Sequence, residues 1–290
     1  MPAGVDITGL LILLAGGVAL VAFWRRGCLA SDALLAGPTR DTGLTAADLV
    51  MGLTLWLAGQ LAVPTLLLPA LGVEFGPDLA EQLPITYAQF VLLAQLAAYT
   101  PPTLYLLLRA SFHAGGIDGL RQLGLGTAHA RDALRLTALA ILGGLPLVMA
   151  VLSLTRLVSI WLGAPAPPVA HDLLQYIATV DTLAELLTLI LAAVIVAAVV
   201  EEIFFRGLLQ GALVAMLGPR WRWTAVLVVA AGFAAIHLGG VTWHALPGLM
   251  TLGVIMGWLY ERSGSLWPAI ALHAAFNALN IALVRAGAVG

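Results

Sequence analysis

The amino-acid sequence predicts an all-α protein, a polytopic transmembrane helix bundle with about eight spans. Of its 290 residues, 61% are hydrophobic and only 10% are charged, whereas a soluble domain carries roughly 25% charged residues. The mean hydropathy of +1.01 agrees with this prediction. A net charge of −2 offers no basic stripe of the kind that nucleic acid requires. We therefore expect membrane lipid, and not nucleic acid, as a partner.

Eight apolar runs are the candidate spans. A helix needs about twenty apolar residues to cross a hydrocarbon core of ~30 Å. Several later runs are shorter, which fits helices that are buried among neighbouring helices. In chain order the runs lie near 7–24, 49–71, 88–108, 134–155, 182–200, 223–238, 247–260 and 266–284.

The arginines predict the orientation of the chain in the membrane. They cluster after the first, third, fifth and seventh runs, whereas the loop 72–87 carries three acidic residues and no arginine. The positive-inside rule then puts both termini outside and the arginine-rich loops in the cytoplasm. All thirteen basic residues are arginine, which is typical of a GC-rich genome. We expect a multi-pass protein of the bacterial plasma membrane.

Two segments do not fit a simple span. Pro101-Pro102 interrupts the third run, so we expect that helix to break or kink there. The segment from Gly115 to Arg135 mixes leucines with charged residues, which predicts an amphipathic helix at the cytoplasmic interface. Residues 1–181 are thus predicted to form N-terminal membrane spans with an interfacial segment, and residues 182–284 a separate core.

Two adjacent acids, Glu201 and Glu202, end the apolar run of the fifth span. Carboxylates at membrane depth are costly and are usually functional. Glu202 and Arg206 are four residues apart with the glutamate first, which favours an ion pair on one helix face. Glu201 lies about 100° round the helix from Glu202. We expect Glu202 to pair with Arg206 and Glu201 to face a cavity in the cytoplasmic half.

Three further polar residues lie in the later spans: His237, His273 and Asn277. Taken singly, His237 fits a packing residue, and His273 and Asn277, stacked on one helix face, fit an inter-helix hydrogen bond. Together with Glu201 they can converge only inside the bundle. Peptide hydrolysis needs a base that activates water and donors that stabilise the oxyanion. Glu201 with His237 can supply the first, and His273 with Asn277 the second.

In this order and spacing the motifs resemble those of the CPBP intramembrane proteases, a family that includes the type II CAAX prenyl endopeptidases and lysostaphin-resistance-like and bacteriocin-immunity-like proteins. The motifs are Glu201-Glu202-x-x-x-Arg206, Phe233-x-x-x-His237 and His273-x-x-x-Asn277, and the stretch from Gly253-x-x-x-Gly257 to Pro268 is also similar. Leu249 stands where the family often has an aromatic residue. The resemblance covers roughly residues 182–284. It implies that Glu201 is the base, His237 its partner, His273 and Asn277 the oxyanion site, and Glu202 and Arg206 supporting residues.

The expected activity is hydrolysis of a peptide bond in a membrane-associated protein or peptide near the cytoplasmic leaflet, with water entering from the cytoplasm. The family has been described both as glutamate-type and as metal-dependent. The sequence lacks His-Glu-x-x-His, which favours a site without a cofactor, although Glu201, His237 and His273 could supply three ligands for a zinc ion. The alternatives are a non-catalytic membrane scaffold or immunity protein that keeps the protease fold, and a transporter with a proton relay.

The other histidines carry no motif. His244 falls in a short outside loop, where we expect it to be solvated, and His113, His129 and His171 fall in connecting segments. The sequence alone assigns none of them to the site.

Overall fold

The computed structural model describes residues 7–76, 78–126, 130–164, 167 and 169–287, and in these ranges helices are the regular elements, with no β-strand. His129, one of the histidines without a motif, lies outside the described residues. The prediction of an all-α bundle is therefore confirmed. The N-terminal half contains α1 (Ile7–Arg25), α2 (Ala46–Ala62), η1 (Val63–Leu67), α3 (Leu68–Ala70), α4 (Leu79–Gln82), α5 (Tyr87–Ala114), α6 (Ile117–Gln122), α7 (Ala130–Leu139), η2 (Ala140–Gly144) and α8 (Leu145–Trp161).

The C-terminal half continues as α9 (Asp172–Thr179), α10 (Leu183–Ile190), η3 (Leu191–Val196), α11 (Ala197–Glu202), η4 (Ile203–Gln210), α12 (Gly211–Leu217), η5 (Pro219–Trp221), α13 (Arg222–Ile236), η6 (Trp243–Ala245), α14 (Leu246–Ser263) and α15 (Trp267–Arg285). The segments η1 to η4 are π-helical turns within longer helices, and η5 and η6 are short 3₁₀ turns. Such local widening of a helix is frequent at functional sites.

Six of the helices are long and apolar enough to cross a membrane: 7–25, 46–70, 87–114, 131–161, 183–217 and 267–285. All eight predicted runs are helical, but the count of eight spans is not confirmed. The helix α13 has only 15 residues, which gives a length of about 22 Å at 1.5 Å per residue. It packs against α14 on one face, while Leu227 and Val228 on the other face are exposed.

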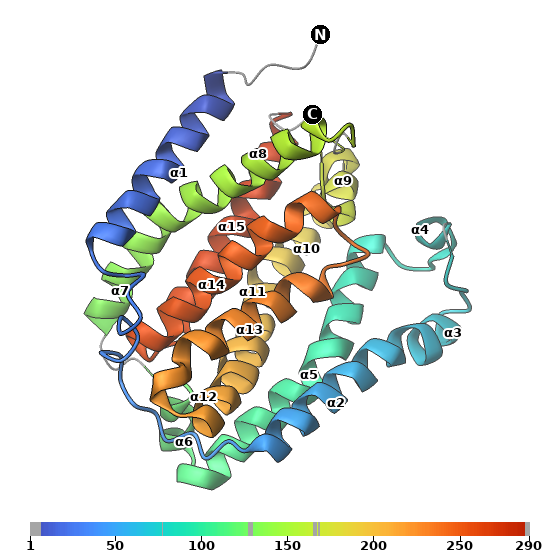
Figure 1. The fold of residues 1–290 in the computed structure, drawn as a ribbon. Helices are drawn as coiled ribbons and strands as arrows, with labels where there is room; N and C mark the ends of the chain where they lie inside the picture. Colours follow the sequence, from blue (N-terminus) through green and yellow to red (C-terminus); the bar gives the residue numbers. More distant parts are fainter. Residues whose placement is uncertain (1–6, 77, 127–129, 165–166, 168, 288–290) are drawn as a thin grey trace.

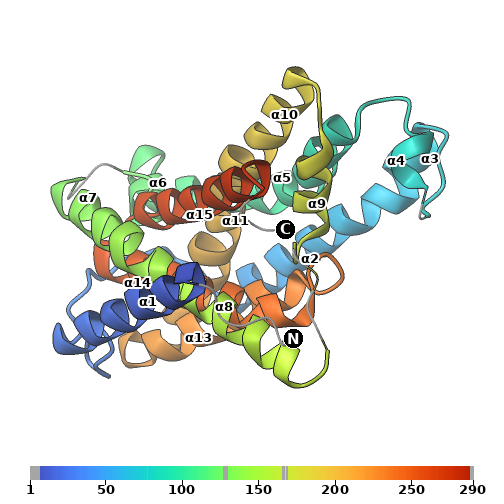
Figure 2. The same ribbon diagram turned by 90° about the horizontal axis from the view of Figure 1, so that it is seen from above.

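The helices surround the long helix formed by α10, η3, α11, η4 and α12 (Figure 1). Helix α1 packs along α8, α2 packs along α5, and α13 packs along α14. Helix α1 begins and α15 ends at the same end of the bundle (Figure 1). Seen along the bundle, α9 lies beside the end of α15 (Figure 2).

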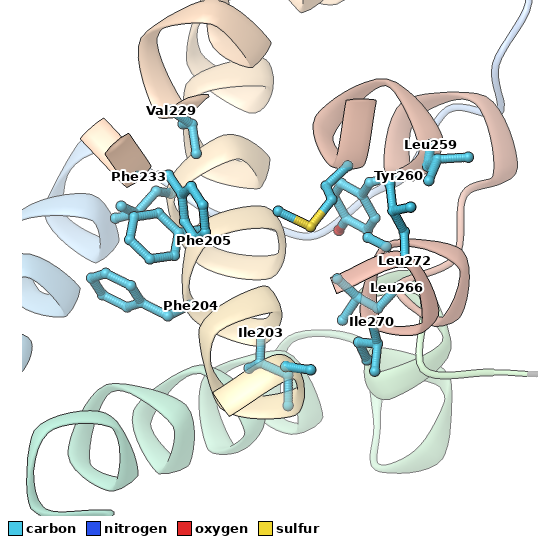
Figure 3. Close-up of a cluster of buried hydrophobic side chains, with 14 of the residues drawn as sticks. Ile203, Phe204, Phe205, Val229, Phe233, Leu259, Tyr260, Leu266, Ile270 and Leu272 are labelled. Carbon is cyan, nitrogen blue, oxygen red and sulfur yellow. The ribbon is translucent and has the colours of Figure 1, made fainter. Parts of the chain in front are cut away.

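The core is built around the aromatic residues that follow the two glutamates. Phe204, Phe205 and Phe233 are nearly inaccessible to solvent, and Figure 3 shows η4 presenting its side chains toward α13 on one side and α14 and α15 on the other. The ring centroids of Phe205 and Phe233 are 5.2 Å apart in an edge-to-face arrangement, which aromatic pairs prefer. This packing holds the glutamate-bearing helix against α13.

The expected break at Pro101-Pro102 is absent, because α5 runs without interruption from Tyr87 to Ala114. Prolines at these positions remove the donors for the carbonyls of Ala97 and Ala98. Gly59 of α2 lies against both carbonyls: a Cβ there would stand 2.5 Å from the oxygen of Ala97 and 2.9 Å from that of Ala98. Close packing of α2 therefore covers the carbonyls that the prolines leave without donors.

The segment from Gly115 to Arg135 is not one interfacial helix. It contains the short helix α6, and α7 begins at Ala130 and leads into the span that ends at Trp161. The charged residues Asp132 and Arg135, 3.6 Å apart and largely exposed, are thus in the first turns of a spanning helix. Amphipathic periodicity alone could not separate these two elements.

Candidate active site

Glu201 and Glu202 lie in the middle of a helix and not at its end. The helix continues from Leu183 to Leu217, and the residues from Ile203 to Ala212 after the glutamates are all buried. The glutamates are therefore followed by further turns of buried helix. At this point the backbone changes from α11 to the π-helical η4.

Glu202 and Arg206 form the expected ion pair. The Nη1 atom of Arg206 lies 2.8 Å from Oε1 of Glu202, and both side chains are fully buried. Arg206 also donates from Nη2 to the carbonyl of Gly253 on α14, at 3.0 Å. Separating the two charges would leave each of them buried and uncompensated. The pair therefore holds the turn of helix that carries both glutamates, and the bond to Gly253 ties that turn to α14.

His273 joins the two glutamates. Its Nδ1 lies 2.9 Å from Oε1 of Glu202, and its Nε2 lies 4.0 Å from Oε2 of Glu201. Since an ionised carboxylate only accepts hydrogen bonds, Nδ1 carries a proton and donates it to Glu202. Nε2 therefore faces Glu201. Glu202 has a second partner that its helical spacing did not predict.

His237 is held by its own helix. Its Nδ1 lies 2.7 Å from the carbonyl oxygen of Phe233, so Nδ1 is the donor and Nε2 is left as an acceptor in the neutral ring. The ring of Phe233 packs against both His237 and His273, with centroids 4.8 and 5.7 Å away. Among the described residues no hydrogen bond joins His237 to Glu201, although both line the same cavity.

Asn277 donates from Nδ2 to the carbonyl of Ala193, at 2.7 Å. This bond ties α15 to η3 and corresponds to the inter-helix role that Asn often has in membranes. The side-chain amide has two N–H donors, so one remains for another acceptor. Asn277 is four residues from His273 on the same helix.

One cavity of about 330 Å³ brings the predicted residues together. Glu201, His237, His273 and Asn277 all line it, while Glu202 and Arg206 lie behind them and fully buried. Most of the remaining wall is apolar. The four residues come from the central helix, the end of α13 and α15, so they converge inside the bundle.

The sequence motifs did not place three further titratable residues in the cavity wall: Arg156, His171 and His244. His244 is only 5% exposed, so the expectation that it is solvated is wrong. The loop is held inward because Thr155 on α8 donates to the carbonyl of His244, at 2.7 Å. Nothing in the spacing of these residues links them to the motifs, because they reach the cavity through packing between distant segments.

The two histidines among these residues, His171 and His244, lie outside the spanning segments and have lowered pKa values. Burial lowers the pKa of His171 to about 4, with a smaller contribution from His237. Burial lowers the pKa of His244 as well, and the nearby Arg156 adds to the effect. His171 is also the N-cap of α9, since its Nδ1 accepts the amide of Leu173 at 3.1 Å. Both rings favour the neutral form.

The cavity extends away from the arginine-rich end of the molecule. Its wall includes Val169 to His171 before α9 and His244 before α14, and these are segments that the arginine distribution puts outside. The end of α1 that carries Arg25, and α6, which carries Arg121, lie at the other end of the bundle (Figure 1). With the orientation predicted from the arginines, the end of the cavity near α9 would lie on the outer side of the membrane.

The described side chains do not fit a zinc site. No three His, Cys, Asp or Glu side chains among them come together in a way that could hold one ion, whereas a catalytic zinc has three protein ligands. We therefore derive no step through a metal.

The fold and the cavity define a multi-pass membrane protein with a carboxylate, two histidines and an amide on a buried site. Residues 183–279, about a third of the chain, match the family model of the type II CAAX prenyl endopeptidase Rce1-like proteins. This match over residues 183–279 supports the resemblance to the CPBP family, and the matched range contains every residue of the three motifs. No curated protein and no solved structure gave a match.

Proposed function

We propose that this protein is an intramembrane endopeptidase that hydrolyses a peptide bond of a membrane-associated protein or peptide. The observation that carries the proposal is the convergence of Glu201, His237, His273 and Asn277 on one cavity. Apolar walls suit a lipid-anchored or membrane-embedded substrate. The family match supports the same reaction class.

Glu201 is the proposed general base. Its Oε2 atom has no hydrogen-bond partner in the described part of the chain and lies 4.0 Å from Nε2 of His273. A water about 2.8 Å from each atom, an ordinary hydrogen-bond distance, can bridge this gap. The free Nε2 of His237 accepts a hydrogen bond from this water and helps to orient it. Glu201 takes a proton from the water while the oxygen of the water bonds to the carbonyl carbon of the substrate.

The resulting tetrahedral oxyanion needs donors. The second N–H of Asn277 and the Nε2–H of His273 in its doubly protonated form are the proposed donors. Glu202 orients the ring of His273 because it accepts from Nδ1, at 2.9 Å. As the carbon–nitrogen bond breaks, the proton held by Glu201 passes to the amine nitrogen of the leaving peptide, and the carboxylate is regenerated.

The test uses purified protein in liposomes with membrane-anchored peptides, presented both with and without a prenyl group. Glu201→Gln and His237→Ala are expected to lower kcat by at least about 10²-fold each, the usual contribution of a general base. Glu185→Gln is the matched control, because Glu185 lies on the same long helix, accepts a hydrogen bond from Tyr176 and does not line the cavity. Full proteolysis by Glu201→Gln would exclude the mechanism and favour a scaffold role.

Metal dependence is tested in the same assay. Because the described residues offer no three-ligand set, we expect a chelator such as 1,10-phenanthroline to leave the rate unchanged and elemental analysis to give well under one zinc per chain. Stoichiometric zinc, with loss of activity on its removal, would contradict this expectation.

A further inference from the structure

Arg156 is an arginine without an acidic partner in the wall of the candidate active-site cavity. It lies in the last turns of α8 and is partly buried. Within the described chain its guanidinium has neither an ion pair nor a hydrogen bond, in contrast to Arg206, Arg222 and Arg285, whose guanidinium groups bind carboxylates or backbone carbonyls. A partly buried guanidinium without a partner in a cavity wall loses hydration that nothing in the described chain replaces, so its presence calls for a function.

The surroundings of Arg156 favour an anion. Among the described residues that line the cavity, Glu201 is the one carboxylate and Arg156 the one guanidinium. The rings nearest to Arg156 include His244, whose titration it affects, and His244 is buried. A small anion in this part of the cavity would therefore meet a cation and no negative charge except the proposed base.

The rest of this wall is apolar. Met149 and Leu152 of α8 and Leu173 and Leu174 of α9 line it together with Arg156. Apolar side chains around a single guanidinium fit a peptide that has apolar residues and one carboxylate, since Arg binds carboxylates through two parallel hydrogen bonds. A cavity of about 330 Å³ has room for a few residues of such a peptide and for little more.

We propose that Arg156 binds a carboxylate of the substrate peptide and thereby selects where the chain is cut. The inference rests on the proposed protease function. Two sources can supply the carboxylate: the free C-terminus of the substrate, or an Asp or Glu side chain beyond the scissile bond. In either case Arg156 positions the substrate through its non-reacting part, while Glu201 acts on the peptide bond.

Binding can be measured without catalysis. The probe is N-acetyl-Leu-Val-Ala with a free carboxylate, compared with the same peptide as its C-terminal amide. Binding to the inactive Glu201→Gln protein in detergent is followed by the shift of the thermal unfolding midpoint. We expect the free acid to bind about 10- to 100-fold more tightly than the amide, as for a charge-assisted hydrogen bond.

Substitution of Arg156 gives the decisive comparison. Arg156→Gln is expected to abolish the preference for the free acid, and Arg156→Lys to restore part of it, because lysine keeps the charge but not the paired donors. Arg220→Gln is the matched control, since Arg220 is exposed and lies at the other end of the bundle. If the Arg156→Gln protein kept the full preference, or if both peptides bound the parent protein equally, the proposal would be overturned.

Cleavage assays separate the two carboxylate sources and the two proposals. In wild-type protein, a loss of kcat/KM on amidation of the C-terminus, absent in Arg156→Gln, points to the terminal carboxylate. A loss on Asp→Asn or Glu→Gln exchange within the substrate points to a side chain. If Arg156→Gln lowered kcat/KM by the same factor for acid and amide substrates, carboxylate selection by Arg156 would be refuted. If no substrate were cleaved while the Glu201→Gln protein still bound the free acid more tightly than the amide, only the protease function would be refuted.

Discussion

At the scale of residues, the two adjacent glutamates have different environments. Glu202 is fully buried between Arg206 and His273, whereas Glu201 lines the cavity with one carboxylate oxygen unpaired among the described residues. The difference follows from the angle of about 100° between neighbouring side chains on a helix. One carboxylate therefore supports the site while its neighbour is free to react.

Removing Glu202 should damage the fold more than removing Glu201. Glu202→Met leaves Arg206 as an uncompensated buried charge, which costs about 3–5 kcal/mol when one member of a buried pair is lost. We expect a much lower thermal unfolding midpoint for Glu202→Met in detergent, and a nearly unchanged midpoint for Glu201→Gln.

The double variant Glu202→Met, Arg206→Met is the control. Replacing both members of a buried pair with apolar residues is often neutral, so this variant should regain most of the stability. It should stay inactive, because His273 has lost the acceptor for its Nδ1. A double variant as unstable as the single one would show that Glu202 acts on the fold through another contact.

His171 should make the stability depend on pH. Its pKa is about 4 in the folded protein, below the usual 6.5, mainly because it is buried. The unfolded chain therefore binds a proton between these values while the folded protein does not, so stability falls as pH decreases from 6.5 toward 4 and levels off below. The shift from 6.5 to about 4 corresponds to roughly 3 kcal/mol. Thermal unfolding between pH 7.5 and 4 measures it.

His171→Asn is the matched variant for this experiment. Asparagine keeps an acceptor at the N-cap of α9 but does not titrate. The unfolding midpoint of this variant should decrease less than that of the wild type over the same pH range. Parallel curves for the two proteins would show that other groups cause the acid sensitivity.

At the scale of elements, local rules predicted the helices and not their contacts. The apolar runs and the pair Glu202–Arg206 follow from spacing within one helix, and both are present. The continuation of α5 through Pro101-Pro102 depends on Gly59 of another helix. The position of His244 likewise depends on Thr155. Contacts between segments distant in sequence leave no periodic signal. The places of Arg156, His171 and His244 in the cavity wall could therefore not be predicted.

The contact between α13 and α14 depends on Gly253. A Cβ there would lie 3.0 Å from Cα and Cβ of Ala230, and small residues allow such close helix packing in membranes. Gly253→Val should push α13 outward, lowering stability by about 1–3 kcal/mol and displacing His237, with a loss of activity. Gly232→Val on α13 is the control, because a Cβ at Gly232 would meet nothing within 4 Å. Equal effects of the two substitutions on unfolding and activity would contradict this view of the contact.

At the scale of the whole molecule, charge and cavity are arranged at opposite ends. Arginines gather near the C-terminal ends of α1, α5 and α14 and in the segments that follow α1, α5 and α12, while α9 and the loop before α14 border the cavity. The positive-inside rule puts the arginine-rich end in the cytoplasm. With this orientation the cavity would open toward the opposite side, and we expect substrate and water to reach Glu201 from outside.

Labelling with a membrane-impermeant maleimide in intact cells tests this orientation. Cys28 is the single cysteine, so a Cys28→Ser background allows one reporter at a time. Val169→Cys, in the cavity wall, should be labelled without permeabilisation, because the cavity opens outside. Asp118→Cys, exposed on α6 at the arginine-rich end, should be labelled only after the membrane is opened. Labelling of Asp118→Cys in intact cells, with Val169→Cys protected, would reverse the orientation and restore access from the cytoplasm.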